Sequence, residues 1–504
     1  MQVLYGFQPV LFATAPILMF LGANLDSFGL ASATRALALA AGLVLIIWGL
    51  FFGALRDARK AALMTSLVAV LFWSSKSLVT LLPELPSITP ITMGLLWGGG
   101  LPVAAVLLAR TSFDLIPIYR IVTVAGLVGV LFPLASVALY EGPQFSNIPA
   151  LVGNEQVESQ PQLPDIYLIV LDAYGRDDEL REHFGLEKGL GSRLRELGFY
   201  VADESSANYS TSIHSIPSLL NAGYIQGLLP RTTKALLIKL LHENRVVKFL
   251  RRRGYETISY DSGFVLTQLK DADQYIEPPP TQVILGMSVR LTAFEHGLLP
   301  STPLDTWVRR VADLSPYAEH RERILHGLSD ISRHADNPNP TFAFLHVLAP
   351  HEPFVFDEDG RDVSPNDLPY KLNRIYHDPD QPLEPGQVGP EYARRYRAQA
   401  SYLTERVTAT AREILRRSPE PPIILILGDH GPYGFSPNIG QASFAILNAL
   451  FLPDGGDAML YPTISPVNMF RVVMNRYLGT DLPMLPDRRF RTSYLNAHVY
   501  EEVD

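Results

Sequence analysis

The sequence predicts two structural parts: an N-terminal five-helix transmembrane bundle, followed by an α/β domain with a mostly parallel sheet covered by helices. Three observations predict this fold class: an uneven distribution of charge, five apolar stretches near bilayer length, and short apolar runs that alternate with helical segments. The 504-residue chain has a net charge of −9; residues 1–145 hold only seven basic and five acidic side chains, a net of +2, which leaves −11 for the other 359. A single soluble fold is therefore excluded, and the acidic remainder argues against a nucleic-acid partner.

The first part contains five apolar stretches, each close to the roughly 20 residues that cross a bilayer. They cover residues 4–23, 34–54, 61–82, 91–109 and 119–140. Gln8, Pro9 and Pro16 interrupt the first stretch, and a cleaved signal peptide is its alternative interpretation. Because this stretch lacks a basic start and a small-residue cleavage site, we expect a retained helix.

Basic residues predict the orientation of these helices. Arg56, Arg59 and Lys60 lie between the second and third stretches, and Arg110 and Arg120 bound the loop before the fifth. Basic loops stay on the cytoplasmic side, so we expect the N-terminus inside. An odd number of spans then places the remainder of the chain outside.

A polar, proline-containing linker at residues 146–163 separates the transmembrane domain, residues 1–145, from an outer domain at residues 164–504. In the outer domain, apolar runs predict strands at residues 165–172, 199–202, 255–260, 341–348 and 422–429, with helices at 179–197 and 245–253. Apolar runs separated by helices indicate a parallel sheet covered on both faces. Residues 262–340 and 354–400 are richer in Pro, Asp and Arg, and we expect them to be insertions around the sheet.

Several kinds of chemistry are excluded by what the sequence lacks. The chain contains no cysteine, which rules out disulfides, thiol nucleophiles and iron–sulfur clusters. It also contains no glycine-rich phosphate loop and no G-x-S-x-G nucleophile elbow.

Polar residues follow three of the predicted strands, at the carboxyl ends where parallel sheets bind ligands. Asp172 follows the strand at 165–172, His351 follows the strand at 341–348, and Asp429 and His430 follow the last strand. Asp172 alone could cap the next helix, and His351 alone could be a turn residue. Two adjacent metal-type ligands after a wholly apolar strand are typical of a metal site.

Hydroxyl residues gather in the segment 208–221, NYSTSIHSIPSLLN, just before a short apolar helix. A helix N-terminus leaves backbone N–H groups free and favours an anion. With a metal beside it, a hydroxyl in this position can act as a nucleophile toward a phosphate. The alternative is that these residues only cap the helix.

Taken in order, the segments PDIYLIVLDAYGRD, NYSTSIHSIPSLLN, FLHVLAPHEPF and ILILGDHG resemble the alkaline-phosphatase superfamily in its sulfatase-like branch, over residues 164–455. With five spans ahead of such a domain, the chain is similar to the lipoteichoic acid synthases and the lipid A phosphoethanolamine transferases. The resemblance implies transfer of a phospho-alcohol group from a phospholipid donor to an envelope glycan or lipid acceptor. It also implies a multi-pass protein of a bacterial-type cytoplasmic (inner) membrane, with an extracytoplasmic catalytic domain.

The resemblance also implies roles for individual residues. The expected ligands of one divalent metal ion are Asp172, Ser212, Asp429 and His430. Carboxylates with an imidazole suit Zn²⁺ or Mn²⁺ better than an all-oxygen Ca²⁺ site. Ser212 matches the nucleophile, with Thr211 and Ser215 as alternatives, and His351 matches the histidine that contacts the transferred phosphoryl group. The chain departs from the similar five-span enzymes where Asp172 replaces a usual Glu and Ser212 a usual Thr.

Four further residues are interpreted from their positions. Tyr174 and Arg176 lie just beyond Asp172 and are expected to reach the phosphate or the acceptor. A surface salt bridge is the alternative for Arg176. His214 and His346 are expected to be packing residues, not ligands of a second metal.

Sulfate-ester hydrolysis in this branch needs a Cys or Ser, oxidised to formylglycine, within a C/S-x-P-S-R motif. Residues 215–218 match the first four positions of the serine form, but Leu219 occupies the position of the Arg. This mismatch favours phosphoryl chemistry over sulfate-ester hydrolysis. Two alternatives remain open. One is a phospho- or sulfo-ester hydrolase of the same fold, and the other is a non-catalytic partner in envelope assembly.

Overall fold

The computed structural model describes residues 5–25, 27–80, 95–140, 150–151, 163–279, 283–284, 287–288, 291–304, 316–363, 389–432, 443–494 and 496–503. The chain forms two compact units: Met1–Gly142 with Pro280–Ser315, and Pro143–Pro279 with Pro316–Asp504. The sequence places residues 280–315 among the insertions around the sheet, whereas their contacts group them with the first unit. The predicted linker lies largely outside the described residues.

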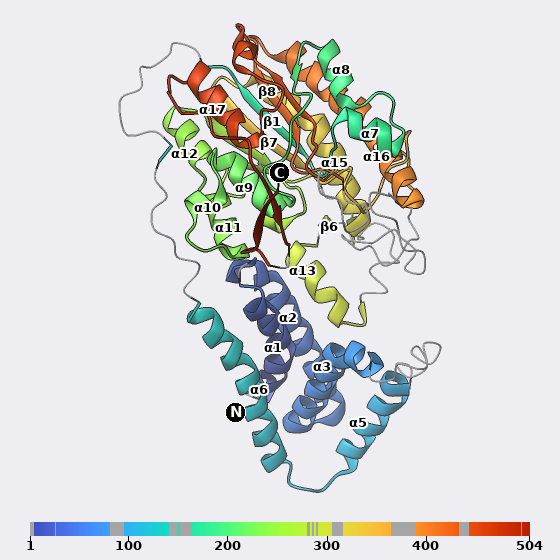
Figure 1. The fold of residues 1–504 in the computed structure, drawn as a ribbon. Coiled ribbons are helices and arrows are strands. Elements are labelled where there is room, and N and C mark those ends of the chain that lie inside the picture. Colours follow the sequence, from blue (N-terminus) through green and yellow to red (C-terminus); the bar gives the residue numbers. More distant parts are fainter. Residues whose placement is uncertain are drawn as a thin grey trace. The chain divides into compact units, whose positions relative to one another are not determined.

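The first unit is built mainly from helices (Figure 1). α1 spans Phe7–Ala23, α2 Leu30–Leu55, α3 Ala58–Thr80, α5 Leu101–Arg110 and α6 Ile116–Ala138, with a π-helical turn at Leu95–Gly100. Two of them, α2 and α6, are long and apolar enough to cross a membrane, while α1 and α5 are apolar but shorter. Residues 81–94, which contain parts of the third and fourth predicted stretches, lie outside the described residues.

Close packing joins α1 to α6. Gln8 is fully buried, and its amide Nε2 donates to the carbonyl of Tyr119 and to the hydroxyl of Thr123, at 3.1 Å each. One turn further along α6, a Cβ at Gly126 would lie 3.0 Å from the Cβ of Leu11, so the small residue permits the close approach. Small residues and interhelical hydrogen bonds of this kind are typical of helix packing in membranes.

The inserted segment adds short elements to the first unit. An antiparallel hairpin pairs β5, Val283–Ile284, with β6, Met287–Ser288. It is followed by helix α13, Ala293–Leu298, and a 3₁₀ turn, η4, at Leu299–Ser301.

The second unit contains a seven-stranded sheet in the order β2-β9-β8-β1-β7-β3-β4 (Figure 1). The strands are β1 Ile166–Leu171, β2 Tyr200–Val201, β3 Glu256–Tyr260, β4 Gln274–Ile276, β7 Thr341–Val347, β8 Ile423–Gly428 and β9 Asn448–Phe451. β1 pairs in parallel with β7 and β8, β3 pairs in parallel with β7 and β4, and only β9 and β2 run antiparallel to their neighbours. The predicted α/β class with a mostly parallel sheet is confirmed.

Helices cover both faces of the sheet, and β1 is buried on both (Figure 1). Its side chains at Tyr167, Ile169 and Leu171 join the core formed with α7, Asp177–Phe184, α8, Leu190–Glu196, α15, Pro316–Asp330, and α16, Pro390–Arg417. The alternate side chains join a second core with α9, Ser212–Asn221, α12, Arg245–Arg252, and α17, Pro466–Tyr477. Burial on both faces explains why the strand is apolar throughout rather than alternating.

The remaining elements lie around this framework. They are α10 Ile225–Leu228, α11 Lys234–His242, the antiparallel pair β10 Arg489–Thr492 and β11 Tyr500–Val503, and short 3₁₀ turns at Val265–Thr267, Ile331–Asp336 and Gly456–Met459. Figure 1 shows α10 and α11 beside α9, on the same side of the sheet.

The single helix predicted at residues 179–197 is two helices. α7 ends at Phe184 because Gly185 takes a left-handed conformation, with φ of 66°, which glycine adopts without steric cost. α8 then begins at Leu190, where Asp177 accepts hydrogen bonds from the backbone amides of Gly191 and Ser192. The prediction missed this break because the intervening turn is short.

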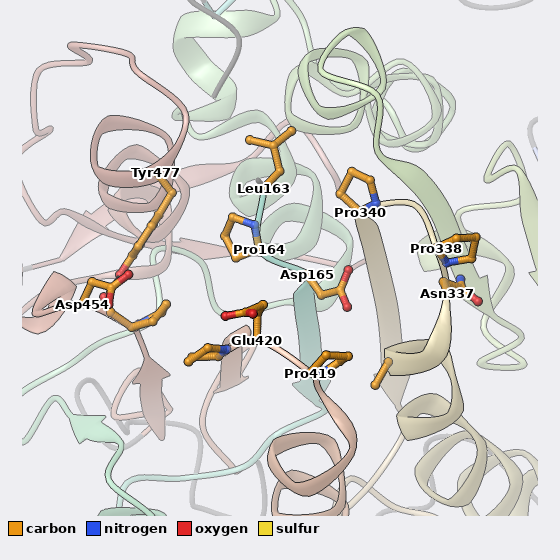
Figure 2. A pocket seen from close by; sticks show the side chains of 13 residues that line it. Leu163, Pro164, Asp165, Asn337, Pro338, Pro340, Pro419, Glu420, Asp454 and Tyr477 are labelled. Atoms are coloured by element: carbon orange, nitrogen blue, oxygen red, sulfur yellow. The ribbon is translucent and has the colours of Figure 1, made fainter. Parts of the chain in front are cut away.

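The amino ends of β1, β7 and β8 border a surface cavity of about 520 Å³ (Figure 2). Its lining is rich in proline and also includes Asp165, Glu420 and Asp454. Asp165 accepts a hydrogen bond from the backbone amide of Thr341 at 2.7 Å. Burial raises the pKa of Asp165 to about 6, although that hydrogen bond opposes the rise.

Candidate active site

The carboxyl ends of the three central strands lie at one edge of the sheet. Leu171, the last residue of β1, is level with Val347 of β7 and with Gly428 of β8. Asp172 follows β1 directly, and Asp429 and His430 follow β8 directly. Strand pairing therefore brings these three residues to one place.

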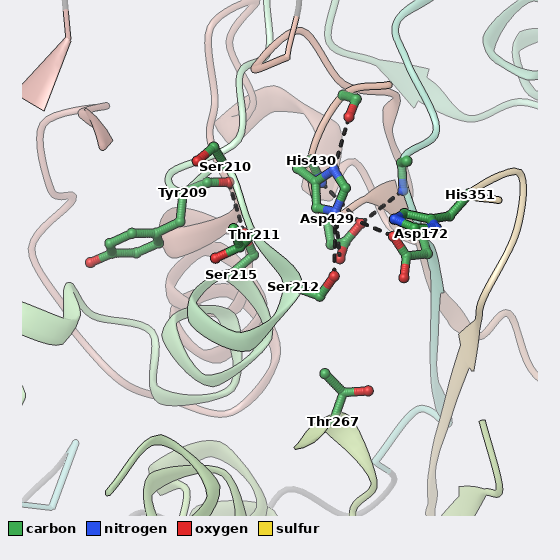
Figure 3. A network of polar contacts seen from close by, with 12 residues as sticks. Asp172, Tyr209, Ser210, Thr211, Ser212, Ser215, Thr267, His351, Asp429 and His430 are labelled. Carbon is green, nitrogen blue, oxygen red and sulfur yellow. Dashed lines mark hydrogen bonds and ion pairs between the residues drawn. The ribbon is translucent and has the colours of Figure 1, made fainter. Parts of the chain in front are cut away.

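Asp172, Asp429 and His430 form a buried cluster (Figure 3). One potential ligand atom from each residue lies within 4.8 Å of the others. The Nε2 atom of His430 is 3.2 Å from Oδ1 of Asp172 and 3.8 Å from Oδ2 of Asp429. This is a suitable arrangement for a single cation.

The carboxylate of Asp429 is held by the backbone on one side only. Its Oδ1 accepts hydrogen bonds from the amides of Ala173 at 3.1 Å and of His430 at 3.0 Å. Its Oδ2 and the Oδ1 of Asp172 are buried, and no described donor reaches either in hydrogen-bonding geometry. A buried charged oxygen without a donor is costly, by more than the about 1–3 kcal/mol of a neutral group, and a cation would remove that cost.

The orientation of His430 also fits a metal. Its Nδ1 lies 2.8 Å from the carbonyl oxygen of Gly431, which can only accept, so Nδ1 carries the hydrogen and Nε2 presents a lone pair to the carboxylates. Burial lowers the pKa of His430, but the charges of Asp429 and Asp172 outweigh burial and raise it to about 9. A positive charge is therefore favoured at this position, as a proton or as a metal ion.

Ser212 is the first residue of α9, and its side chain points into the cluster (Figure 3). Its Oγ lies 3.3 Å from Nε2 of His430. The preceding residue, Thr211, has the extended backbone of an N-cap. The Ser212 hydroxyl thus lies at a helix N-terminus, where the backbone favours an anion.

The alternative hydroxyls are engaged elsewhere. The Nε2 of His214 donates to the carbonyl of Ala497 at 2.9 Å, so its Nδ1 accepts from the Thr211 hydroxyl at 2.7 Å. Ser215 donates to the carbonyl of Tyr209 at 2.9 Å. The structure therefore brings Ser212 to the cluster, gives Thr211 and Ser215 local structural bonds, and agrees with a packing role for His214.

His351 also reaches the cluster, from the loop after β7. Its amide donates to the carbonyl of Asp172 at 3.0 Å, and its ring centre lies 6.2 Å from that of His430. Its Nδ1 donates to the carbonyl of Glu352 at 2.5 Å. Burial lowers the pKa of His351, but the charges of Glu352 and Asp172 outweigh burial and raise it above the ordinary value of a histidine.

His346 lies closer to the cluster than the sequence predicts. Its Nε2 is 3.8 Å from Oδ2 of Asp172 and has no described hydrogen-bond partner, while its Nδ1 is 2.8 Å from the hydroxyl of Thr267. Thr267 in turn donates to the carbonyl of Phe264 at 3.3 Å, so its oxygen accepts from Nδ1 and leaves Nε2 with a lone pair. The sequence signal for this position was that His346 is a polar residue near the carboxyl end of a largely apolar strand.

Tyr174 and Arg176, which are expected to reach the phosphate or the acceptor, have other hydrogen-bond partners in the described structure. The Tyr174 hydroxyl is buried between the hydroxyl of Thr404 at 2.7 Å and the amide of Leu190 at 3.2 Å. Arg176 binds both oxygens of Asp178, at 2.7 and 2.8 Å, which is the salt-bridge alternative. The turn after Asp172, in which Ala173 has a φ of 63°, directs both side chains to other parts of the unit.

A scan against protein-family models gave no match, and neither did a search of curated proteins. Among solved structures, the chain is similar to the C-terminal periplasmic domain of EcEptC from Escherichia coli, with 13% identity, 71% of this chain and 96% of that chain covered, and a TM-score of 0.41. It is similar to the periplasmic domain of phosphoethanolamine transferase EptC from Campylobacter jejuni, with 10% identity, 64% and 91% coverage, and a TM-score of 0.38. A third is a protein in the alkaline phosphatase superfamily from Vibrio parahaemolyticus, with 15% identity, 70% and 77% coverage, and a TM-score of 0.37.

Proposed function

We propose that the protein is a membrane-bound, metal-dependent, sulfatase-like phosphotransferase. It moves a phospho-alcohol group from a lipid donor to a cell-envelope glycan or lipid, through a phosphorylated Ser212. The observation that carries the proposal is the Ser212 hydroxyl, which faces an imidazole lone pair and two donor-poor carboxylates at a helix N-terminus.

Four residues would hold one divalent ion: Asp172, Ser212, Asp429 and His430. Two carboxylates and one imidazole favour Zn²⁺ or Mn²⁺ over Ca²⁺. When bound, the ion lowers the pKa of the serine hydroxyl and neutralises charge on the phosphoryl oxygens. The buried oxygens of Asp172 and Asp429 without donors support this assignment.

The chain's own groups supply the rest of the reaction. The Oγ of Ser212, whose proton has first passed to solvent, attacks the phosphorus of the donor as an alkoxide. The bond from phosphorus to the diacylglycerol-like alcohol breaks as the new Oγ–P bond forms. Protonated His351 donates its proton to the departing alcohol oxygen, as a general acid. The first amides of α9 face the negative phosphoryl oxygens.

The second half of the reaction releases the group from Ser212. An acceptor hydroxyl gives its proton to the now neutral His351 and attacks the phosphorus, and the Ser212 oxygen leaves. A glycan or lipid hydroxyl in this position completes a transfer, whereas water completes a hydrolysis. The same residues serve both outcomes, so the acceptor decides between them.

We further propose a multi-pass arrangement in a bacterial-type cytoplasmic membrane, with the catalytic unit outside. α2 and α6 have the length and composition for this. The inserted segment packs against the C-terminal end of α1 and the N-terminal half of α2, at Ile17, Leu21 and Ala33. The distribution of basic residues assigns these helix ends to the outer side, which supports the proposal.

Turnover of a fluorescent phospholipid by the detergent-purified protein tests the reaction. With an envelope glycan or lipid in the assay, we expect the released fluorescent lipid alcohol to be matched by acceptor that has gained the mass of the phospho-alcohol group. Release matched only by hydrolysis, across a panel of acceptors, would replace the transferase with a hydrolase. No release and no bound metal would favour a non-catalytic partner in envelope assembly.

A further inference from the structure

The inserted segment 280–315 belongs to a different unit from the residues on either side of it in the sequence. Residues before and after it belong to the second unit, yet the segment itself belongs by its contacts to the first. Within the described part of this segment, helix α13 packs against α1 and α2.

Phe294 forms the apolar part of this contact. Its side chain is 1% exposed and packs edge-to-face against Phe20, with ring centres 5.2 Å apart, and against Phe28, with ring centres 5.3 Å apart. Leu298, one turn further along α13, is also buried in this cluster. A Cβ at Gly297 would lie 2.5 Å from the ring of Phe20, so a larger residue would require this ring to move.

Glu295 forms the polar part of the contact. Its Oε1 accepts from Nε of Arg35 in α2 at 2.7 Å, and its Oε2 contacts the second guanidinium nitrogen. Its Oε2 also accepts from the amide of Thr292 at 2.9 Å, while the Thr292 hydroxyl accepts from the amide of Glu295 at 3.2 Å. The same carboxylate therefore closes the capping box that starts α13 and binds the basic residue of α2.

A helix as short as α13 is not stable alone in water, because helix nucleation is unfavourable. Its order depends on the contacts with α1 and α2, and without them Phe294 and Leu298 would be exposed to solvent. We propose that α13 is a non-covalent anchor, the anchor helix: its contacts lie within the first unit, and the chain on either side of segment 280–315 keeps the second unit attached when the linker is cut. The anchor does not depend on the proposed catalytic function.

Cleavage of the linker tests the anchor directly. A protease site is inserted between residues 152 and 162 of the full chain, with an affinity tag at the N-terminus, and the detergent-purified protein is cut and captured through the tag. We expect most of the C-terminal fragment of the wild type to be retained with the tagged helices. Phe294→Ala and Glu295→Gln should each reduce the retained fraction several-fold, because each removes one part of the contact.

Matched variants separate the anchor from general damage. Glu420→Gln, at the cavity of the second unit, should leave retention unchanged. The exchange Arg35→Glu with Glu295→Arg should restore part of the retention that Arg35→Glu alone loses. Complete release of the wild-type fragment after cleavage would overturn the proposal, and so would equal retention of the wild type and both anchor variants.

A cross-linking experiment provides a second readout on the uncut chain. Because the chain has no cysteine, Phe28→Cys with Phe294→Cys introduces the only two thiols. A short thiol cross-linker should join them and hold the fragments together after cleavage under denaturing conditions. Failure to cross-link, with both thiols shown to be reactive, would contradict the contact.

Discussion

The Oγ of Ser212 and the Nε2 of His430 lie 3.3 Å apart, although 218 positions separate the two residues in the chain. The hydroxyl comes from the first turn of α9, and the imidazole follows the end of β8. Because Nδ1 of His430 is occupied by the carbonyl of Gly431, the lone pair of Nε2 is directed to the same point as the hydroxyl and the carboxylates. This point is where we expect the metal and the reacting phosphorus.

Replacing Ser212 by Ala should abolish a covalent phosphorylated form of the protein, since Thr211 and Ser215 are held by His214 and Tyr209. We expect turnover to fall by at least about a thousandfold, as for loss of other catalytic nucleophiles. Intact-mass analysis after incubation with the phospholipid donor measures the added group. Thr211→Ala and Ser215→Ala are the matched controls and should keep the added mass. A phosphopeptide centred on Thr211 in the wild type would show that the nucleophile is misassigned.

Asp429→Asn should remove the metal while preserving the fold. The Asn side chain keeps an oxygen for the amides of Ala173 and His430 but loses the charge that would face the ion. We expect metal affinity to fall by more than about 100-fold, which exceeds the usual effect of an outer-sphere change. Elemental analysis of the purified variant measures the stoichiometry, with Asp178→Asn on the surface as the control. A variant that retains a full equivalent of metal would count against Asp429 as a ligand.

His346→Ala tests the histidine that sequence reasoning interpreted as packing. Its unoccupied Nε2, 3.8 Å from Asp172, suggests that it orients the carboxylate or meets the substrate. We expect a loss of about 10–100-fold in metal affinity or in turnover. Thr267→Val removes the partner of Nδ1 and should cause a smaller loss of the same quantity. Unchanged metal content and kinetics in His346→Ala, with a lowered melting temperature alone, would restore the packing interpretation.

Asp165→Asn should stabilise the protein in mildly alkaline solution. The pKa of Asp165 is raised to about 6 in the folded protein, mainly by burial, so folding favours its protonated form. Its contribution to stability is fully present below the unfolded value near 4 and is lost as the pH rises through 6. The Asn side chain cannot ionise and can still accept from the Thr341 amide. We expect the free energy of unfolding to rise by about 3 kcal/mol at pH 8 and to change little at pH 4.

Melting temperatures in detergent at the two pH values provide the measurement for Asp165→Asn. Asp454→Asn is the control, because it removes a negative charge from the same cavity. An equal pH-dependent gain in this variant would mean that the net charge of the cavity, not Asp165, is the cause. An equal gain at pH 4 and pH 8 would mean that ionisation of Asp165 is not the cause.

The apolar runs that became β1, β7 and β8 were predictable because strands buried on both faces contain few polar residues. The same pattern put Asp172, Asp429 and His430 at the carboxyl edge, since parallel strands end on the same side. The choice of Ser212 among the hydroxyls came from the family resemblance alone, with Thr211 and Ser215 left as alternatives. The orientation of Ser212 toward the cluster required the structure.

Other features could not be predicted because they depend on tertiary contacts. On a strand buried on both faces, alternation does not show which face His346 occupies, so its proximity to Asp172 was missed. Tyr174 and Arg176 follow Asp172 in sequence, but the turn at Ala173 directs them elsewhere. The contact of segment 280–315 with the first helices could not be predicted either, because no local sequence pattern indicates that Phe294 packs against Phe20.

The central position of β1 in the sheet has a consequence for biosynthesis. Its pairing to β7 spans about 176 residues of chain, and its other neighbour, β8, is made later still. During synthesis, the apolar strand thus has no partner on either edge for a long interval, which is a period of aggregation risk. Asp172 is likewise synthesised before Asp429 and His430. The proposed metal site is therefore complete only after β8 and the residues that follow it have been synthesised. For the exported arrangement proposed above, the destination compartment, not the cytoplasm, would then determine which metal the protein receives.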